Sequence, residues 1–261
     1  SAAAHENGLL YHAAGHGFTC ECYGVPGLGW QPYAWPEDKR SVLAERNGVR
    51  TLNREIPLIS ALCYSNSSVQ ECLTDEVVRY AQAHPEVDFV HFWLDDGMNN
   101  KCECERCRGE RVADSYIRML NLLDQKLSAR NLDTKIVFLS YYELLWPPQR
   151  ERLNHSKRFI FMFAPIERSF LEPLPSVEDA GELPPYVLND QHFPHNNAQM
   201  MAFLKAWNEY RSSNQIPLAN SFDYDYYCSD YNDPGQFVQA QIVYTDVKNL
   251  HKNGLGGIIN C

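Results

Sequence analysis

Carboxyl groups follow two of the short apolar runs in the chain, where they could act together as acid and base. Asp95 and Asp96 come at the end of the run Asp88–Leu94, and Glu143 follows the run Lys135–Tyr142. A pair of carboxyl groups can cleave a glycosidic bond, one as general acid and the other as base or nucleophile. We therefore expect Asp96 to be the general acid and Glu143 the base or nucleophile. Asp95 is the third catalytic candidate, but successive residues of a strand point in opposite directions, so only one of the two aspartates can enter the cleft.

Each of these carboxyl groups also has a purely structural interpretation. Asp95-Asp96-Gly97 could be a simple turn, because Asp and Gly are favoured turn residues. Glu143 on its own could be a surface residue that opens the loop to Pro147-Pro148. The catalytic interpretation therefore depends on the residues that surround them.

Aromatic and polar residues near the ends of the apolar runs are candidates for holding a sugar, because rings pack on its C–H faces and polar groups bind its hydroxyls. His16 follows the first run between two glycines, where the backbone can come close to a ligand. The other candidates are Trp93, Tyr142, Asp223 and Asp225. The segment 222–227 alternates, so either its aspartates or its tyrosines face inward.

Three cysteines lie within Cys102-Glu103-Cys104-Glu105-Arg106-Cys107. Three thiols this close cannot all pair with one another, and this spacing is typical of zinc sites. The preferred fourth ligand is Cys63, at the end of the preceding predicted strand, rather than Cys20, Cys22, Cys72 or Cys228. A site with four cysteines has no open position, so we expect a structural zinc that pins the loop carrying Asp96. A disulfide with one free thiol is the alternative, natural in an exported protein.

Hydrophobic periodicity predicts the elements that must position these residues. Apolar runs rich in β-branched and aromatic residues predict strands at Leu9–Ala13, Pro57–Cys63, Asp88–Leu94, Lys135–Tyr142, Arg158–Ala164, Ile216–Phe222 and Leu255–Asn260, with a weaker one at Tyr186–Leu188. Amphipathic patterns predict helices near Val69–Ala83, Val112–Leu127, Ala198–Arg211 and Phe237–His251.

Strands that alternate with helices predict a parallel α/β sheet, and seven or eight of them at this length point to a TIM-type (β/α)8 barrel. The active site of such a barrel forms at the C-terminal ends of its strands, where the candidates lie. A doubly wound sheet is the alternative, but Gly24–Gly29 lacks the glycine spacing of a phosphate-binding loop. We expect one domain over residues 1–261. The chain stops within or just after a predicted strand, so we expect a piece of a longer multidomain protein, with the barrel incomplete.

Composition excludes two classes of partner. The 261 residues carry 33 acidic and 23 basic side chains, a net charge of -10, with no block of Lys or Arg, which argues against nucleic acid and anionic membranes. No apolar stretch approaches the roughly 18 to 20 residues that cross a bilayer, and we see no signal peptide in this chain. We therefore expect no nucleic acid partner and no membrane insertion. The 12% of aromatic residues favours a ring-lined polar cleft.

Four sequence elements together carry a family resemblance. They are Gly15-His16; Leu62-Cys63 followed by Ser65-Asn66; Asp95-Asp96-Gly97 with Cys102-Glu103-Cys104 and Cys107; and Ser140-Tyr141-Tyr142 before Pro147-Pro148. With them the chain, roughly from Leu9 to Tyr231, resembles the family called domain of unknown function 4838. This is a group of bacterial barrels placed with the glycoside hydrolases and similar in layout to α-glucuronidases and β-hexosaminidases.

The resemblance implies a carbohydrate-active barrel, often exported and joined to further domains of the same polypeptide. It places Asp96 at the family's strand-end acid and matches Cys63, Cys102, Cys104 and Cys107 to its thiol pattern. An extracytoplasmic location, in the periplasm, at the cell surface or secreted, follows from it. The chain departs from the hexosaminidases by having Asp-Asp where an Asp-Glu pair would be expected, which shortens the acid arm.

Three hypotheses of function follow. The first is a glycoside hydrolase-like protein that acts on a complex glycan, one containing uronic acid or amino sugar, and needs no cofactor for catalysis. The second is a non-catalytic carbohydrate-binding barrel module, which would bind sugar without turnover. The third is a metal-dependent hydrolase using His12, His16 and the strand-end aspartates, although the sequence lacks the His-x-His and His-Glu-x-x-His patterns.

Overall fold

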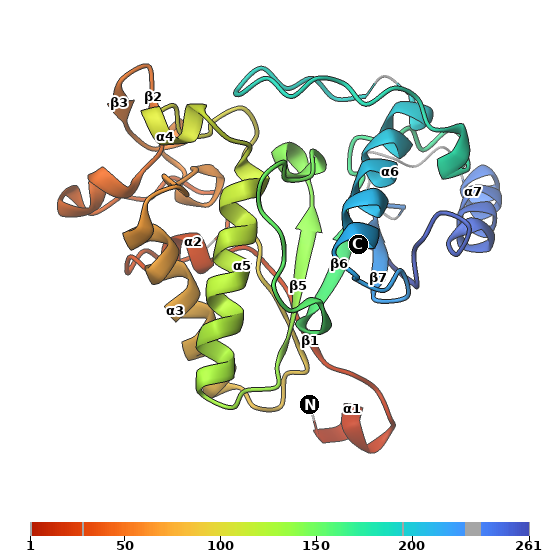
Figure 1. Ribbon diagram of the computed structural model, residues 1–261, viewed down its shortest axis with the longest axis horizontal. Helices are drawn as coiled ribbons and strands as arrows, with labels where there is room; N and C mark the ends of the chain where they lie inside the picture. The colour runs from red at the N-terminus through yellow and green to blue at the C-terminus, as the bar shows by residue number, and fades with distance from the viewer. Residues whose placement is uncertain (1, 28, 195, 228–235, 261) are drawn as a thin grey trace. The chain divides into compact units, whose positions relative to one another are not determined.

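The computed structural model describes residues 2–27, 29–194, 196–227 and 236–260, which form an α/β protein (Figure 1). The chain divides into two compact units, and each is described by itself. Unit 1 comprises Ser1–Phe138, Pro148–Phe159 and Val187–Gln191, and unit 2 comprises Leu139–Pro147, Ile160–Tyr186 and His192–Cys261. The expectation of a single domain stays a prediction.

Parallel strands in the order β1-β4-β5 form the sheet of unit 1. They are β1 (His12–Ala13), β4 (Phe89–His91) and β5 (Lys135–Ser140), and the residues of β5 up to Phe138 belong to this unit. Val90 in the middle of β4 is aligned with Ala13 of β1 and Ile136 of β5. Apart from its first residue, β5 is buried throughout, the pattern of a strand covered on both faces.

Two long helices of unit 1, α3 (Ser67–Ala83) and α5 (Val112–Ala129), pack against each other (Figure 1). The Asn66 side chain accepts a hydrogen bond from the Ser68 N–H at 3.0 Å and caps the start of α3. The apolar face of α5 has no exposed surface at Tyr116, Met119, Leu120, Leu123 and Leu127. These residues recur with the helical period, the amphipathic pattern from which a helix over Val112–Leu127 was predicted.

Shorter elements complete unit 1. They are α1 (Ala2–Glu6), α2 (Phe18–Glu21), β2 (Glu45–Arg46), β3 (Val49–Arg50), α4 (Glu105–Arg108) and the 3-10 helices Glu37–Val42, Asn53–Glu55, Pro57–Ile59 and Ser156–Arg158. The antiparallel hairpin β2–β3 turns through Asn47 at φ 50° and Gly48 at φ 77°. Asn-Gly is the preferred pair for such a turn.

Unit 2 contains the parallel strands β6 (Phe159–Phe163), β7 (Ser221–Asp225) and β8 (Ile258–Asn260), in that order. Its helices are α6 (Asn197–Ser213), α7 (Gln236–Asn249) and the 3-10 helices Tyr142–Leu145 and Val177–Asp179. Trp207 of α6 is fully buried, packs on Phe161 of β6 with ring centroids 5.2 Å apart, and donates through Nε1 to the Leu144 carbonyl at 2.9 Å.

The prediction of a closed (β/α)8 barrel is wrong. The described residues contain six parallel strands, and the predicted strands Pro57–Cys63 and Tyr186–Leu188 do not form. The first of these begins as a 3-10 helix, because Pro57 has a fixed φ and no N–H for a ladder. Its later residues then bond to an irregular segment instead, Ala61 accepting from the Ala44 N–H at 2.9 Å.

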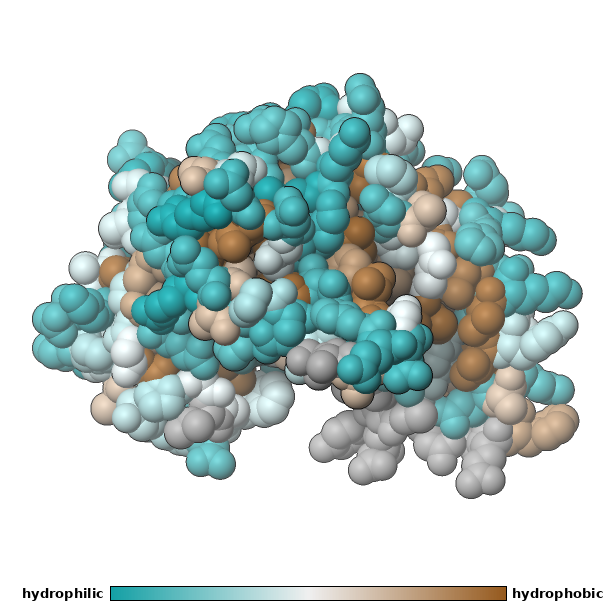
Figure 2. All heavy atoms as spheres, turned by 90° about the horizontal axis from the view of Figure 1, so that it is seen from below, coloured by the Kyte–Doolittle hydropathy of each residue, from teal (hydrophilic) through white to brown (hydrophobic). Residues whose placement is uncertain are grey.

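The other predicted strands and the four predicted helices are confirmed as elements, with shifted ends. Hydrophilic residues cover much of the face shown in Figure 2, in keeping with the many charged side chains of the sequence. None of the described helices is long and apolar enough to span a membrane.

Leu120 tests the packing of α5. Leu120→Ala is expected to lower the free energy of unfolding by about 2 to 5 kcal/mol, because it removes buried methyl groups and leaves a cavity. Val49→Ala is the control, since Val49 is 59% exposed and its change should stay within about 0.5 kcal/mol. Urea denaturation followed by circular dichroism measures both. Equal effects would contradict the burial of this helix face.

Candidate functional site

The loop after β4 contains a buried aspartate. Asp95 accepts a hydrogen bond from the Tyr64 hydroxyl on Oδ1 and lies 2.7 Å from Lys101 Nζ through Oδ2. The same ammonium group also donates to the Gly97 carbonyl, and neither charged side chain is appreciably exposed. Burial, and then the charge of Asp95, raise the pKa of Tyr64, so its hydroxyl stays protonated as a donor. Asp95 therefore holds the loop in place.

Asp96 points into a different environment. Its Oδ2 accepts a hydrogen bond from Trp30 Nε1 at 2.6 Å, and its Oδ1 lies 3.6 Å from His16 Nε2. His16 Nδ1 is 2.9 Å from the Leu94 carbonyl, which can only accept, so Nδ1 carries a hydrogen. The other imidazole nitrogen, Nε2, faces Asp96.

Aromatic rings and two further imidazoles surround His16. Trp93 packs edge-on to His16 with ring centroids 4.9 Å apart, and His91 packs in the same way on Trp93 at 5.7 Å. His12 Nδ1 lies 3.0 Å from His91 Nε2. Burial, followed by the charge of His12, lowers the pKa of His91 to about 3, and burial lowers that of His12. His91 is therefore uncharged at neutral pH.

The four predicted metal-binding cysteines come together. Their sulfur atoms all lie within 4.8 Å of one another, and none is in a disulfide. Cys63 Sγ is 3.7 Å from Cys104 Sγ and 4.0 Å from Cys107 Sγ. Hydrogen bonds from Cys102 and Cys107 lower the pKa of Cys63, which favours a thiolate within the cluster. These four residues could hold a metal ion.

The hairpin β2–β3 supports the cysteine cluster. The Glu45 N–H donates to Cys102 Sγ at 3.3 Å, and the Glu103 N–H donates to the Glu45 carbonyl at 2.7 Å. Arg50 Nη1 lies 4.0 Å from Cys102 Sγ, so a cation adjoins the thiols. The Asn189 side chain donates to the Lys101 carbonyl at 2.8 Å, which ties the segment Val187–Gln191 to the loop that carries the cysteines.

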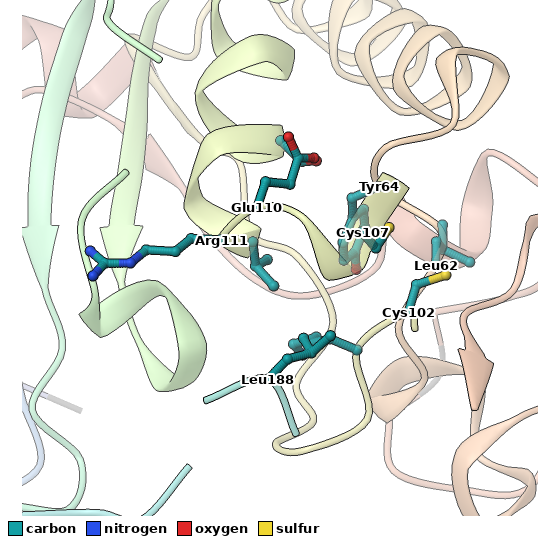
Figure 3. Close-up of a pocket in the computed structure, with 10 residues that line it drawn as sticks. Leu62, Tyr64, Cys102, Cys107, Glu110, Arg111 and Leu188 are labelled. Carbon is teal, nitrogen blue, oxygen red and sulfur yellow. The ribbon is translucent and has the colours of Figure 1, made fainter. Parts of the chain in front are cut away.

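A small cavity of about 20 Å³ adjoins the cluster, roughly enough for one water molecule (Figure 3). Its lining comes from three parts of unit 1: Leu62 and Tyr64, the segment from Lys101 to Ser115, and Leu188. Cys102 and Cys107 both face it, so the thiol cluster and the loop that holds Asp95 share this wall.

Glu143 and Tyr142 lie in unit 2. Glu143 is buried in the 3-10 helix Tyr142–Leu145, where it is 1% exposed. Tyr142 is half-buried, with its ring 4.0 Å from that of Tyr141 and 5.5 Å from that of Phe193. The catalytic pairing of Asp96 with Glu143 stays a prediction.

Asp223 and Asp225 of β7 face the interior of unit 2 and have no exposed surface. Arg168 Nη1 lies 2.8 Å from Asp225 Oδ2 and 2.8 Å from Asp246 Oδ2, so one guanidinium serves two carboxylates. Asp246 also accepts from the Tyr227 hydroxyl at 2.7 Å. The alternation along β7 thus turns its aspartates inward and leaves Tyr224 and Tyr226 half-exposed. A sugar-binding role for Asp223 and Asp225 stays a prediction.

Sequence reasoning missed three residues that matter to these sites. Trp30 lies in an irregular loop with no periodic signal, and its contact with Asp96 spans 66 residues. Lys101 lies directly before the cysteine motif, and a single lysine in an acidic loop could have suggested a partner for Asp95. Asp246 carried no signal, because it lies within an amphipathic helix pattern. Of the alternative zinc ligands considered, Cys228 lies outside the described residues.

The metal-dependent hydrolase gains no support from the geometry. Across residues 2–27, 29–194, 196–227 and 236–260, the four cysteines are the only group of three or more such ligating side chains close enough to share an ion. His12, His16 and the strand-end aspartates form no such group.

The buried acid Asp223 predicts a pH dependence of stability. Burial, and then the charge of Asp225, raise its pKa well above the ordinary value. The folded chain therefore keeps a proton that the unfolded chain loses above about pH 4, so the free energy of unfolding falls as the pH rises through this range. Asp223→Asn should remove this fall and stabilise the protein at neutral pH. Urea denaturation at acidic, neutral and alkaline pH measures it.

Asp246→Asn is the contrasting variant. It should destabilise the protein by about 1 to 3 kcal/mol, because Arg168 keeps Asp225 but the amide replaces only part of the acceptors that Asp246 offers to Arg168, Leu174 and Tyr227. An unchanged pH slope in Asp223→Asn would contradict the protonated state of Asp223.

Comparison with known proteins gives one match. The family model described as domain of unknown function, DUF4838, matches residues 31–210. Neither the curated proteins nor the solved structures contain a match. The matched range is more than half of the chain and contains Asp95, Asp96 and all four clustered cysteines. The chain therefore belongs to the DUF4838 family.

Proposed function

We propose that the protein acts on complex glycans by carboxylate acid–base chemistry, with Asp96 as the general acid. The position of the Asp96 carboxyl group carries this proposal: it follows β4 and lies between the indole of Trp30 and the imidazole of His16. Active sites of parallel α/β folds form at the C-terminal ends of the strands. The acid is therefore where such a fold places its chemistry.

The surroundings of Asp96 suit proton transfer to a sugar oxygen. Trp30 Nε1 occupies one carboxyl oxygen, and the other faces His16 and is the one that would give up the proton. His16 is fixed by the Leu94 carbonyl, so its Nε2 could return a proton to Asp96 after each turnover. The Trp30 ring is 62% exposed although its N–H is anchored, which leaves a ring face for a sugar.

A non-catalytic carbohydrate-binding module is the alternative function. One observation favours it: Asp95, the neighbour of Asp96, is tied to Lys101 and Tyr64, so it is not a second acid for the same cleft. Glu143 remains the candidate for the second carboxyl group. On the family resemblance alone, we also propose that the protein works outside the cytoplasm, together with further domains of the same polypeptide.

We propose that the metal held by Cys63, Cys102, Cys104 and Cys107 is zinc. Zn–S bonds of about 2.3 Å give S···S edges of about 3.8 Å in a tetrahedron. The separations from Cys63, 3.7 Å and 4.0 Å, bracket that edge. Four thiolates leave no position for water, so the role of this zinc would be structural: it would fix the loop between Asp96 and Cys107.

Asp96→Asn tests the catalytic proposal. The variant is expected to lose hydrolysis by a factor of about 10² to 10⁴, because the amide cannot donate the proton. Release of sugar from aryl glycosides and natural glycans, including uronic acid and N-acetylated sugars, measures it. Asp38→Asn is the control, since the Asp38 side chain is 73% exposed. Glu143→Gln tests the second carboxyl group separately.

The outcomes separate the two functions. A parent protein that binds sugars saturably but cleaves none would support the binding module. Full activity in Asp96→Asn would overturn the role of Asp96, and a parent protein that neither binds nor cleaves any glycan would overturn the proposal.

Zinc content and thermal stability test the metal. The protein is expected to carry about one zinc ion per chain, and Cys104→Ser should lower both zinc content and Tm, because a structural zinc site contributes directly to folding. Cys72→Ser is the control, since Cys72 is outside the cluster and should keep the zinc. Elemental analysis and thermal scans measure them. A zinc-free protein with a disulfide among the four cysteines would contradict the assignment.

A further inference from the structure

Unit 1 contains a cavity of about 150 Å³ beside His16. Pockets for drug-sized ligands commonly span about 300 to 1,000 Å³, so this one suits a single sugar ring rather than a longer glycan. It is lined by Ala13, Ala14, Gly15, His16, Gly17, Phe18, Glu21, Tyr80 and His91. Because His16 also faces Asp96, the cavity adjoins the proposed acid.

Two walls of the cavity suit a sugar. Phe18 and Tyr80 stand edge to face, with ring centroids 5.8 Å apart, and offer apolar surface to C–H groups. Gly15 has φ +144°, and a Cβ atom built there would meet nothing within 4 Å. The backbone at Gly15 is therefore open to a ligand.

One carboxylate of the lining has no partner of its own. A Cβ atom built on Gly17 would come within 3.3 Å of Glu21 Oε1, so the carboxyl group lies close to the Gly17 backbone. Glu21 is an exposed residue, so this carboxyl group lines the cavity on its solvent side. Its side chain forms no hydrogen bond or ion pair within the part of the chain that the structure describes. Burial raises the pKa of Tyr80, and the neighbouring Tyr11, Glu86 and Glu21 add to the effect, so two carboxylates lie near this wall.

The cavity lining has no permanently charged cation. No Lys or Arg is among the lining residues, and His91 is uncharged at neutral pH. Beyond the lining, the Asp96 carboxyl faces His16, and His12 Nδ1 lies 3.0 Å from His91 Nε2. The His84 ring lies 4.4 Å from that of Tyr80, and its Nδ1 is 3.3 Å from Glu86 Oε1. A uronic acid would bring its carboxylate close to the Glu21 carboxylate with no Lys or Arg in the lining to bind it, whereas an ammonium group would meet Glu21.

We propose that this cavity is a subsite for a sugar with a free amino group, held by Glu21, and that it disfavours uronic acids. The inference rests on the proposed function and names the class of sugar that the site prefers. It decides between the two kinds of glycan that the sequence left open.

Binding of three methyl glycosides that differ in charge tests the subsite. The probes are methyl glucosaminide, methyl glucoside and methyl glucuronide, titrated into the zinc-loaded full chain of the Asp96→Asn variant by calorimetry at low salt. The amino sugar is expected to bind at least about tenfold more tightly than the uronide, a difference of about 1.4 kcal/mol. Glu21→Gln should remove most of this preference. Glu6→Gln, an exposed residue outside the cavity, should keep it.

Each outcome decides the proposal. Uronide binding equal to or tighter than that of the amino sugar would overturn it, and so would an unchanged order in Glu21→Gln or no binding of any probe. Because binding is measured without turnover, the preference can be found even if the protein hydrolyses nothing. Conversely, hydrolysis without a charge preference would overturn this inference and leave the proposed function intact.

Discussion

An ammonium group and a carboxylate meet inside unit 1, where the buried side chains of Lys101 and Asp95 lie 2.7 Å apart. Removing either partner would leave a buried charge without compensation, so the pair strongly constrains the loop in between. Within that loop, Asn100 accepts from the Ala61 N–H at 2.8 Å. A Cβ atom at Gly97 would lie 2.2 Å from the Ile59 carbonyl oxygen. These contacts hold the loop after β4 against the segment that contains Ile59 and Ala61.

The two chemical features of unit 1 depend on this one loop. Asp96 is the residue directly after Asp95, and Cys102 is the residue directly after Lys101. The carboxyl group that faces His16 and the thiols that could hold a metal are thus fixed by the same few residues. A disturbance at the cysteines would reach Asp96 through a short, partly buried stretch of chain.

Helices and most strands could be predicted because their residues repeat with the period of the element they form. The face of α5 and the burial of β5 follow this rule. Pro57–Cys63 misled the prediction, because its apolar residues are buried in an irregular segment rather than in a ladder. The hairpin β2–β3 was overlooked, although its Asn47-Gly48 turn is a local signal. The cysteine cluster was found by spacing, whereas the contact of Trp30 with Asp96 has no local signature.

Unit 2 encloses a charge balance of its own, in which Arg168 serves both Asp225 and Asp246. Asp225, on the strand β7, lies 57 residues after Arg168, and Asp246, on the helix α7, lies 78 residues after it. None of the three side chains is exposed. Loss of Arg168 alone would leave two buried negative charges without a partner. Loss of one aspartate would change the net charge of the buried group. Among relatives, these three positions should consequently change together or not at all, so their covariation would be a sequence-level mark of this fold.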